Sequence, residues 1–334
     1  MRAVVITRHG PPEVLQVQER PRPTLGPGQV RIAVRAAGVN FADTMARVGL
    51  YAPAPKPPGV VGYEVAGEIA EVGEGVEGVA AGDRVMAGTR FGGYAEEVVV
   101  DASDAIPLAD RLSFEEGAAI PVNYSTAWAA LHRYGALEPG ERVLVHAAAG
   151  GVGIAATQLG VAAGAEVHGT ASPSKHEAVR GQGAAEVHDY TRKGWDRGLE
   201  GRFDVVLDAI GGASFRRSYR MLRAGGRLVA FGASSINQGD RRDLRKVLPE
   251  AARMFRGFNL IDQMESSKAV IGLNMLELWD DRRTLEPWIT PLQPLIADGT
   301  VKPVVAAMVP FDQAPEAHRM IAERRNVGKV VLVP

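Results

Sequence analysis

The residues from Arg142 to Gly153 are the part of this chain with the clearest chemical meaning. They read RVLVHAAAGGVG, an apolar strand that runs into a glycine turn. Gly150 and Gly151 let the backbone approach a phosphate closely, and Gly153 lets the following helix pack on the strand. Free N–H groups at the start of that helix would face the anion. The stretch therefore predicts a turn that holds a dinucleotide pyrophosphate.

The neighbouring sequence supplies the rest of a βαβ unit. Residues 154–163 are rich in alanine and predict a short helix, and residues 166–170 predict a second strand. Alanine occupies position 148, where the usual fingerprint has its first glycine. The competing interpretation is a structural glycine turn in an unrelated α/β protein.

The end of the second predicted strand indicates which dinucleotide would bind. An NAD enzyme places a carboxylate there to accept hydrogen bonds from the ribose hydroxyls, but residues 169–175 read GTASPSK. Ser172 and Lys175 are available to contact a 2′-phosphate, which an aspartate would repel and an ammonium would attract. The sequence thus favours NADPH. The competing interpretation of Lys175 is a solvated charge at a helix start.

Composition is that of an ordinary enzyme of two domains. The chain has 334 residues, 46% of them hydrophobic, a formal charge of −1 and no cysteine. This charge gives no reason to expect a nucleic-acid partner, and the missing cysteine excludes disulfides and thiolate metal sites. The first residues read as a strand, and no apolar run approaches the ~20 residues that span a bilayer. We expect a cytoplasmic protein without membrane contact.

The element pattern changes along the chain. Residues 1–120 show short apolar alternations broken by glycine turns, which indicates a β-rich domain. From residue 122 strands and helices alternate, which predicts a doubly wound parallel sheet. Its strands are expected at 142–146, 166–170, 186–188, 203–208, 227–231 and 269–273. The remainder predicts a long helix near 284–298, a helix at 313–324 and a final strand at 328–332 that returns to the first domain.

Six segments in this order resemble the medium-chain dehydrogenase/reductase superfamily: 38–43, 59–67, 82–85, 92–96, 142–153 and 328–332. The chain is most similar to the zinc-independent quinone oxidoreductase branch, and residues 121–127 resemble the vesicle amine transport protein subgroup. The resemblance implies an α/β fold in which a Rossmann domain, residues 122–275, is inserted in a GroES-like β-rich domain, residues 1–121 plus 276–334. It also implies a homodimer formed at the edge strand 268–275.

The catalytic zinc of the related alcohol dehydrogenases is not expected here. Tyr63 stands where that branch has a histidine, and the chain has no cysteine ligand. The seven histidines form no closely spaced ligand pair along the sequence, and His146 is interpreted as packing beside the cofactor turn. We therefore predict no metal and an activity that needs none.

The resemblance also implies the site residues. Asn40 would lie near the nicotinamide, Tyr51 matches a proposed proton donor of enoyl reductases, and Asp43 would cap the helix after Asn40. The alternative for Tyr51 is a wall of the cleft. Thr126 would hold the nicotinamide amide, and Tyr190 would reach the 2′-phosphate. The remaining expected cofactor residues are Ala149, Gly150, Gly151, Val152, Gly153, Thr170, Ser172, Lys175, Phe231, Gly232, Ser234 and Asn326.

Residues 240–256 predict a basic amphipathic helix, which we interpret as covering a cleft or packing on its own protein rather than on a membrane. The sequence as a whole predicts an NADPH-dependent, zinc-independent reductase of quinones or of the activated C=C bonds of α,β-unsaturated carbonyls. The alternatives are an enoyl-thioester reductase and an NADPH-binding module without catalytic activity.

Overall fold

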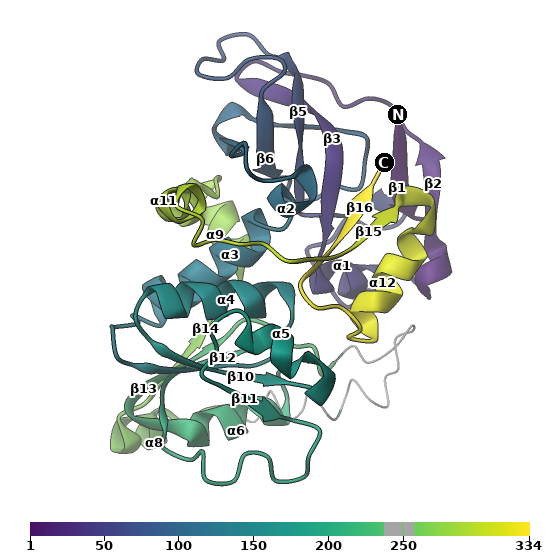
Figure 1. Cartoon of the computed structure of the whole chain (residues 1–334). Coiled ribbons are helices and arrows are strands. Elements are labelled where there is room, and N and C mark those ends of the chain that lie inside the picture. Colours follow the sequence, from purple (N-terminus) through teal and green to yellow (C-terminus); the bar gives the residue numbers. More distant parts are fainter. Residues whose placement is uncertain (237–248, 250–256) are drawn as a thin grey trace.

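A computed structural model describes residues 1–236, 249 and 257–334. Two sheet-containing regions face each other in Figure 1, the β-rich region at the top and the region with a parallel sheet at the bottom. Both termini lie in the β-rich region (Figure 1). The mixed α/β fold predicted from the sequence is confirmed.

The β-rich region contains a sheet of seven strands and a smaller sheet of three. The small sheet consists of β1 (Arg2–Ile6), β2 (Leu15–Glu19) and β4 (Gly59–Val60). The large sheet consists of β3 (Gln29–Val39), β5 (Glu64–Val72), β6 (Arg84–Gly88), β7 (Glu97–Asp101), β8 (Ala105–Pro107), β15 (Val305–Pro310) and β16 (Lys329–Val333).

Strand β3 is the centre of the large sheet, because it pairs with β5, β7 and β16. Its apolar residues Val30, Ile32 and Val34 recur every second position and are buried in the core. Strand β16 joins the sheet from the far end of the sequence and runs antiparallel to β3. The predicted return of the last strand to the first domain is confirmed.

The second region is a six-stranded parallel sheet with the order β11-β10-β9-β12-β13-β14. All six predicted strands are present, and only β13 starts earlier than expected. Their bounds are β9 (Arg142–Val145), β10 (Glu166–Ala171), β11 (Glu186–Asp189), β12 (Phe203–Asp208), β13 (Leu222–Ala230) and β14 (Ala269–Gly272). This is a Rossmann-like arrangement, since successive strands are added on one side of β9 up to β11 and then on its other side from β12 onward.

Helices cover both faces of the parallel sheet. Figure 1 shows α4 on the side toward the β-rich region and α6 and α8 on the opposite side. The helices described are α1 (Phe41–Arg47), α2 (Phe114–Gly117), α3 (Pro121–Trp128), α4 (Gly151–Ala162), α5 (His176–Arg180), α6 (Ala213–Met221), α8 (Leu260–Ser266), α9 (Met275–Arg282), α10 (Glu286–Ile289), α11 (Gln293–Ala297) and α12 (Ala314–Ala322), with a π-helical segment η3 (Ala129–Tyr134) after α3.

The long helix predicted near 284–298 is present as a helical run over residues 286–297, but it is not one regular α-helix. The structure has α10, a 3-10 turn over Thr290–Leu292 and then α11. Prolines 287, 291 and 294 explain the breaks, because each lacks an N–H donor and favours the first turn of a new helix. The helix predicted at 313–324 is present as α12.

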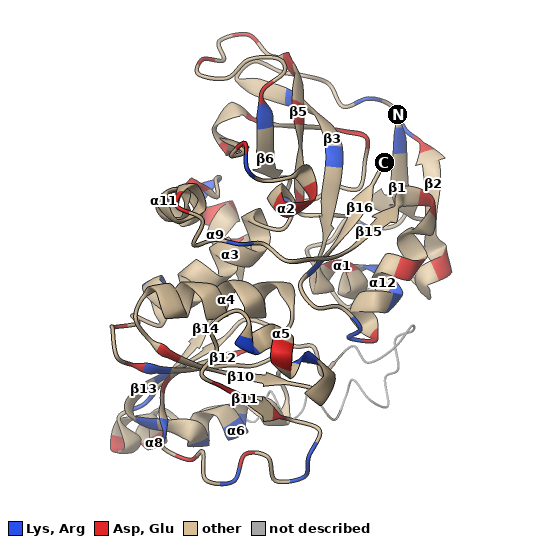
Figure 2. Cartoon of the chain, in the orientation of Figure 1, with Lys and Arg blue, Asp and Glu red and all other residues tan. Residues whose placement is uncertain are grey.

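The predicted basic amphipathic helix, residues 240–256, lies outside the described residues apart from Pro249. Among the helices that the structure describes, none is both long enough and apolar enough to cross a membrane. Figure 2 shows Lys and Arg interspersed with Asp and Glu over the described part of both regions. The domain boundaries at 121/122 and 275/276 stay a prediction.

Candidate active site between the two sheets

One cavity of about 750 Å³ lies between the two regions and takes its lining from both. This volume suits a small-molecule ligand. All the residues that the sequence indicated for cofactor or catalysis line it: Asn40, Tyr51, Thr126, Ala149, Gly150, Gly151, Val152, Gly153, Thr170, Ser172, Lys175, Tyr190, Phe231, Gly232, Ser234 and Asn326.

The glycine turn presents the start of α4 to this cavity. Gly150 is the N-cap residue, and no side chain caps the helix, so its first N–H groups are available to an anion. A Cβ on Gly153 would clash with the carbonyl of Ala147, and one on Gly151 would clash with the Asn123 amide. Both glycines are therefore required by the packing of α4, whereas a Cβ on Gly150 would lie 3.3 Å from its nearest neighbour.

The C-terminal strand is hydrogen-bonded to this turn. Gly328 N–H donates to the Ala149 carbonyl at 2.9 Å, and Gly150 and Gly328 form an isolated parallel bridge. Gly328 has a φ of 88°, and a Cβ there would clash with the Val304 carbonyl. The β-rich region thus contributes backbone directly to the position of the cofactor turn.

The end of β10 has no carboxylate facing the cavity, and Ser172 and Lys175 line it instead. Lys175 Nζ donates to the carbonyls of Arg324 at 2.5 Å and Asn326 at 2.7 Å. Burial lowers the pKa of this half-buried ammonium. Lys175 stands at the start of α5, and its ammonium is also tied to the C-terminal loop. One of its three donors is left for a ligand, and Arg324, which the sequence reasoning missed, lines the cavity beside it.

A chain of hydrogen bonds lies beneath the cavity floor. Thr170 Oγ1 lies 3.2 Å from His146 Nδ1, His146 Nε2 lies 3.0 Å from Ser218 Oγ, and Ser218 donates to Asp208 at 2.6 Å. Because Ser218 donates to the carboxylate, the network assigns the His146 proton to Nε2. Burial lowers the pKa of His146, which favours this neutral form. His146 thus packs beside the cofactor turn and also orients Thr170.

Thr126 lies on α3, with its hydroxyl in the cavity wall. Its Oγ1 donates to the Val122 carbonyl at 2.6 Å, so the remaining lone pairs of this oxygen can accept a hydrogen bond from a ligand amide. In the C-terminal loop that contacts the cofactor turn, Asn326 Nδ2 donates to the Gly328 carbonyl at 2.7 Å. This bond fixes the loop whose carbonyls receive Lys175.

Asn40 is held by charged neighbours at the β-rich side of the cavity. Its Oδ1 accepts from Lys329 Nζ at 2.7 Å, and its Nδ2 donates to Glu64 Oε1 at 3.0 Å. Lys329 also donates to Glu64, whose Oε2 accepts from the Val122 N–H at 2.7 Å. Glu64 and Lys329 are both buried, so this ion pair fixes the amide of Asn40 in one orientation.

The predicted capping role of Asp43 is confirmed. Its Oδ2 accepts from the Asn40 N–H at 2.8 Å at the start of α1, and also from the Tyr94 hydroxyl at 2.8 Å. Its Oδ1 accepts from the Gly62 N–H at 3.1 Å. Burial raises the pKa of Asp43 to about 6, against the lowering effect of these donors. Asp43 ties α1 to the segment that carries Tyr63.

Two tyrosines form one wall of the cavity. The rings of Tyr51 and Tyr63 meet edge to face, with centroids 6.4 Å apart. Burial raises the pKa of both phenols, so both remain protonated at neutral pH. The buried Tyr63 hydroxyl faces the Tyr51 hydroxyl as a donor, at less than ideal hydrogen-bond geometry. Sequence reasoning missed this pairing because it considered Tyr63 only as the replacement of a zinc ligand.

Two residues at the Rossmann side of the cavity, Trp195 and Arg217, were also missed. Trp195 lies between His146 and His188, with ring centroids 5.9 and 6.3 Å away, and the Arg217 guanidinium lies 5.7 Å from the Trp195 ring. Arg217 also pairs with Asp196 at 3.3 Å. No motif marks these positions in the sequence, since they come from loops and from α6.

Comparisons with known proteins agree with this site. Residues 26–110 match the alcohol dehydrogenase GroES-like domain, and residues 182–332 match the zinc-binding dehydrogenase family. The human synaptic vesicle membrane protein VAT-1 homolog is 37% identical over 345 residues, which cover 100% of this chain and 86% of that protein.

Two solved structures are similar over the whole chain. The quinone oxidoreductase of Escherichia coli, solved in complex with NADPH, has a TM-score of 0.84 at 31% identity, with 100% of both chains covered. The CurK enoyl reductase has a TM-score of 0.84 at 27% identity, with 99% of this chain and 98% of that one covered. With its paired sheets, cofactor turn and shared cavity, this chain belongs to the medium-chain dehydrogenase/reductase superfamily.

Proposed function

We propose that this protein is an NADPH-dependent, zinc-independent reductase of quinones or of activated C=C bonds in enones and enals. The observation that carries the proposal is the composition of the cavity between the two regions. A phosphate-binding turn without a ribose-binding carboxylate lies at one end, and Asn40, Tyr51 and Tyr63 lie at the other.

The residues at the Rossmann side fit NADPH. The uncapped start of α4 suits a pyrophosphate, and Ser172, Lys175, Tyr190 and Arg324 offer hydroxyls and cations to a 2′-phosphate. Thr126 retains the accepting capacity that a carboxamide needs. The quinone oxidoreductases of E. coli and Thermus thermophilus, both similar to this chain, were solved with NADPH.

When bound, the dihydronicotinamide supplies a hydride, and this chain's residues supply orientation and a proton. Tyr51 would donate its phenolic proton to the α-carbon or to the carbonyl oxygen of an enone. Tyr63 would donate a hydrogen bond to the Tyr51 oxygen and so hold this phenol in place for proton transfer. Asn40, oriented by Lys329 and Glu64, would position the ribose or the substrate.

Zinc chemistry of the alcohol dehydrogenase type does not fit these residues. Tyr63 occupies the position of a histidine ligand, the chain has no cysteine, and a phenol with a raised pKa is a poor zinc ligand at neutral pH. We therefore propose that turnover needs no metal.

Two other functions remain candidates. The similarity to the CurK enoyl reductase supports an enoyl-thioester reductase, in which the same groups would act on a thioester-conjugated C=C bond. The VAT-1 homolog is named as a synaptic vesicle membrane protein and not for a reductase activity, so an NADPH-binding module without turnover is the other candidate.

Steady-state oxidation of NADPH, measured at 340 nm with a panel of quinones, enones and enoyl thioesters, tests these functions. We expect turnover with quinones or enones. Turnover confined to thioesters would favour the enoyl-thioester reductase. NADPH binding measured by calorimetry, with no turnover on any of the three classes, would favour the binding module.

A further inference from the structure

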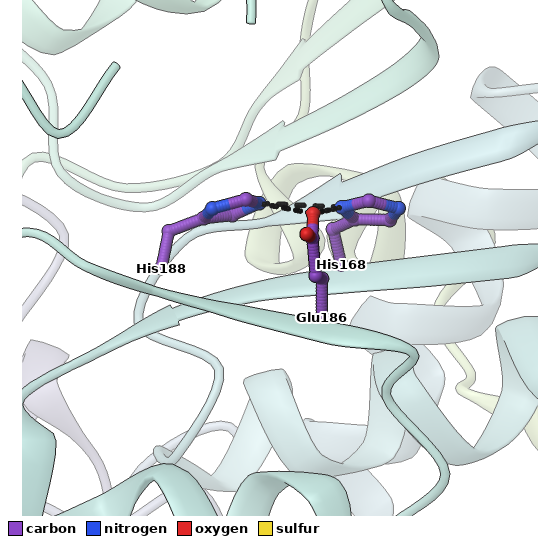
Figure 3. A group of neighbouring side chains, drawn as sticks. All are labelled: His168, Glu186 and His188. Carbon is purple, nitrogen blue, oxygen red and sulfur yellow. Dashed lines mark hydrogen bonds and ion pairs between the residues drawn. The ribbon is translucent and has the colours of Figure 1, made fainter. Parts of the chain in front are cut away.

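The edge of the parallel sheet carries a group of side chains that the proposed reaction does not use. His168 lies on β10, and Glu186 and His188 lie on β11 (Figure 3). The strands pair in parallel with His168 opposite Glu186 and Thr170 opposite His188. Because alternate residues of a strand share a face, all three side chains project from the same face of the sheet.

The donor atoms of this group lie close together. His168 Nδ1 lies 3.2 Å from His188 Nε2 and 3.1 Å from Glu186 Oε2, and His188 Nε2 lies 3.6 Å from Glu186 Oε2. Figure 3 shows the two imidazoles on either side of the carboxylate, with their nitrogens directed at it. In a tetrahedral zinc site with bonds of about 2.0–2.1 Å, neighbouring donors lie about 3.3–3.4 Å apart. A metal ion could contact all three atoms without moving the backbone.

Hydrogen bonding leaves His168 ready to be a ligand. Its Nε2 lies 2.7 Å from Glu166 Oε1, a carboxylate that accepts the imidazole proton. In the neutral ring with its proton on Nε2, Nδ1 presents a lone pair towards the Glu186 oxygen and His188 Nε2. A cation between these three atoms would be attracted by all of them. A carboxylate behind the far nitrogen of a ligand histidine is also the usual support in zinc sites.

Protein atoms would surround such an ion on the side of His168, and the side of Glu186 would be open to solvent. The His168 side chain is 3% exposed and its ring packs edge to face on Phe203, with centroids 5.2 Å apart. The Glu186 side chain is 57% exposed, so an ion can enter from solvent and a water molecule can complete the coordination. His168, Glu186 and His188 are absent from the lining of the cofactor cavity.

We propose that His168, Glu186 and His188 form a structural zinc site that fastens β11, an edge strand of the sheet, to β10. The ligand is a divalent transition metal that accepts imidazole and carboxylate donors, and Mg²⁺, which prefers six oxygen ligands, does not fit. The site stabilises the folded chain and takes no part in hydride transfer.

Calorimetric titration of the full-length, EDTA-dialysed protein with ZnCl₂ tests this proposal. We expect one Zn²⁺ per chain, no binding of Mg²⁺, and Co²⁺ binding with the intense visible absorption of a tetrahedral site. Thermal unfolding should shift to higher temperature with Zn²⁺. Turnover of the wild-type protein should be the same with and without Zn²⁺.

Variants identify the ligands. Glu186→Gln, at an exposed position, and His188→Ala should each weaken Zn²⁺ binding at least tenfold and abolish the thermal shift. Glu177→Gln on α5 and His9→Ala in the β-rich region, both at exposed positions, are matched controls that should bind like the wild type.

Three results would overturn the proposal. The first is wild-type binding of Zn²⁺ no tighter than that of His188→Ala. The second is unchanged binding by Glu186→Gln. The third is turnover that requires Zn²⁺, which would place the metal in the reaction.

Discussion

Lys329 Nζ donates a 2.7 Å hydrogen bond to Asn40 Oδ1, although the two residues are 289 positions apart in the sequence. The same ammonium pairs with Glu64, so the last strand, the start of α1 and the start of β5 meet at one buried ion pair. Asn40 faces the cavity from this junction. The orientation of a candidate active-site amide thus depends on a charge supplied by the far end of the chain.

Removing that charge should destabilise the protein strongly. Lys329→Met leaves Glu64 buried without its cation, and we expect the free energy of unfolding to fall by about 3–5 kcal/mol in urea titrations. The double variant Lys329→Met/Glu64→Gln should recover part of the loss. Lys302→Met, at an exposed position, is the control. If Lys329→Met were as stable as Lys302→Met, the role assigned to Lys329 would be contradicted.

Tyr51→Phe should separate the two substrate classes. We expect NADPH affinity to be nearly unchanged and enone turnover to fall about 10²-fold, because the enone carbon loses its proton donor. Quinone turnover should fall much less, since the reduced oxygens can take protons from water. Tyr134→Phe, outside the cavity lining, is the matched control. Wild-type rates with both substrates would make Tyr51 only a wall of the cavity.

NADPH should bind at least tenfold more tightly than NADH. Loss of one charge-assisted contact costs about 1.5–3 kcal/mol, so Lys175→Ala should remove most of this preference. Lys175 also holds two carbonyls of the C-terminal loop, and its loss can weaken both cofactors. The informative quantity is therefore the ratio of the two dissociation constants, with Lys193→Ala as the control. An unchanged ratio would exclude Lys175 as the phosphate contact.

His318 should make the fold sensitive to acid. Burial, assisted by the charge of Arg47, lowers its pKa to about 3, whereas a histidine in the unfolded chain titrates near 6.5. Between these pH values the unfolded chain binds more protons, so the free energy of unfolding falls as the pH falls from 6.5 towards 3.

At pH 5 protonation of His318 in the unfolded chain lowers the free energy of unfolding by about 2 kcal/mol. Each pH unit below 6.5 contributes about 1.36 kcal/mol. His318→Phe should reduce the acid-induced loss of stability by that amount and keep the edge-to-face contact with Tyr94. Urea unfolding at pH 7 and pH 5 measures it, with His9→Phe as the control. The same pH dependence in His318→Phe and wild type would show that His318 does not set it.

We propose a homodimer formed through β14, the open edge of the parallel sheet. Helix α8 leads into this strand and exposes three large apolar side chains, Leu260, Ile261 and Met264. Light scattering should give twice the 35.5 kDa chain mass for the wild type and a monomer for Met264→Glu. Met308→Glu, equally exposed on β15, should remain dimeric. A monomeric wild type would disprove the interface.

The sequence predicted the sheets and the residues around the cavity well, because glycine turns and alternating strands are local signals. The helix predicted near 284–298 is present but divided, since Pro287, Pro291 and Pro294 each favour the start of a new helical segment. Contacts between distant segments had no local signal. The proximity of His168 and His188 needs the register of β10 and β11, and the pairing of Lys329 with Glu64 needs the return of β16 to β3.

The bridge between Gly150 and Gly328 bears on the order of events during synthesis. Gly150 leaves the ribosome 178 residues before Gly328, the residue that braces its turn. A nascent chain can pair β9 with β10 early, yet the cavity is unfinished until Gly328 has emerged and bonded to Ala149. Tight retention of the nucleotide would then report that the protein has been made through Lys329.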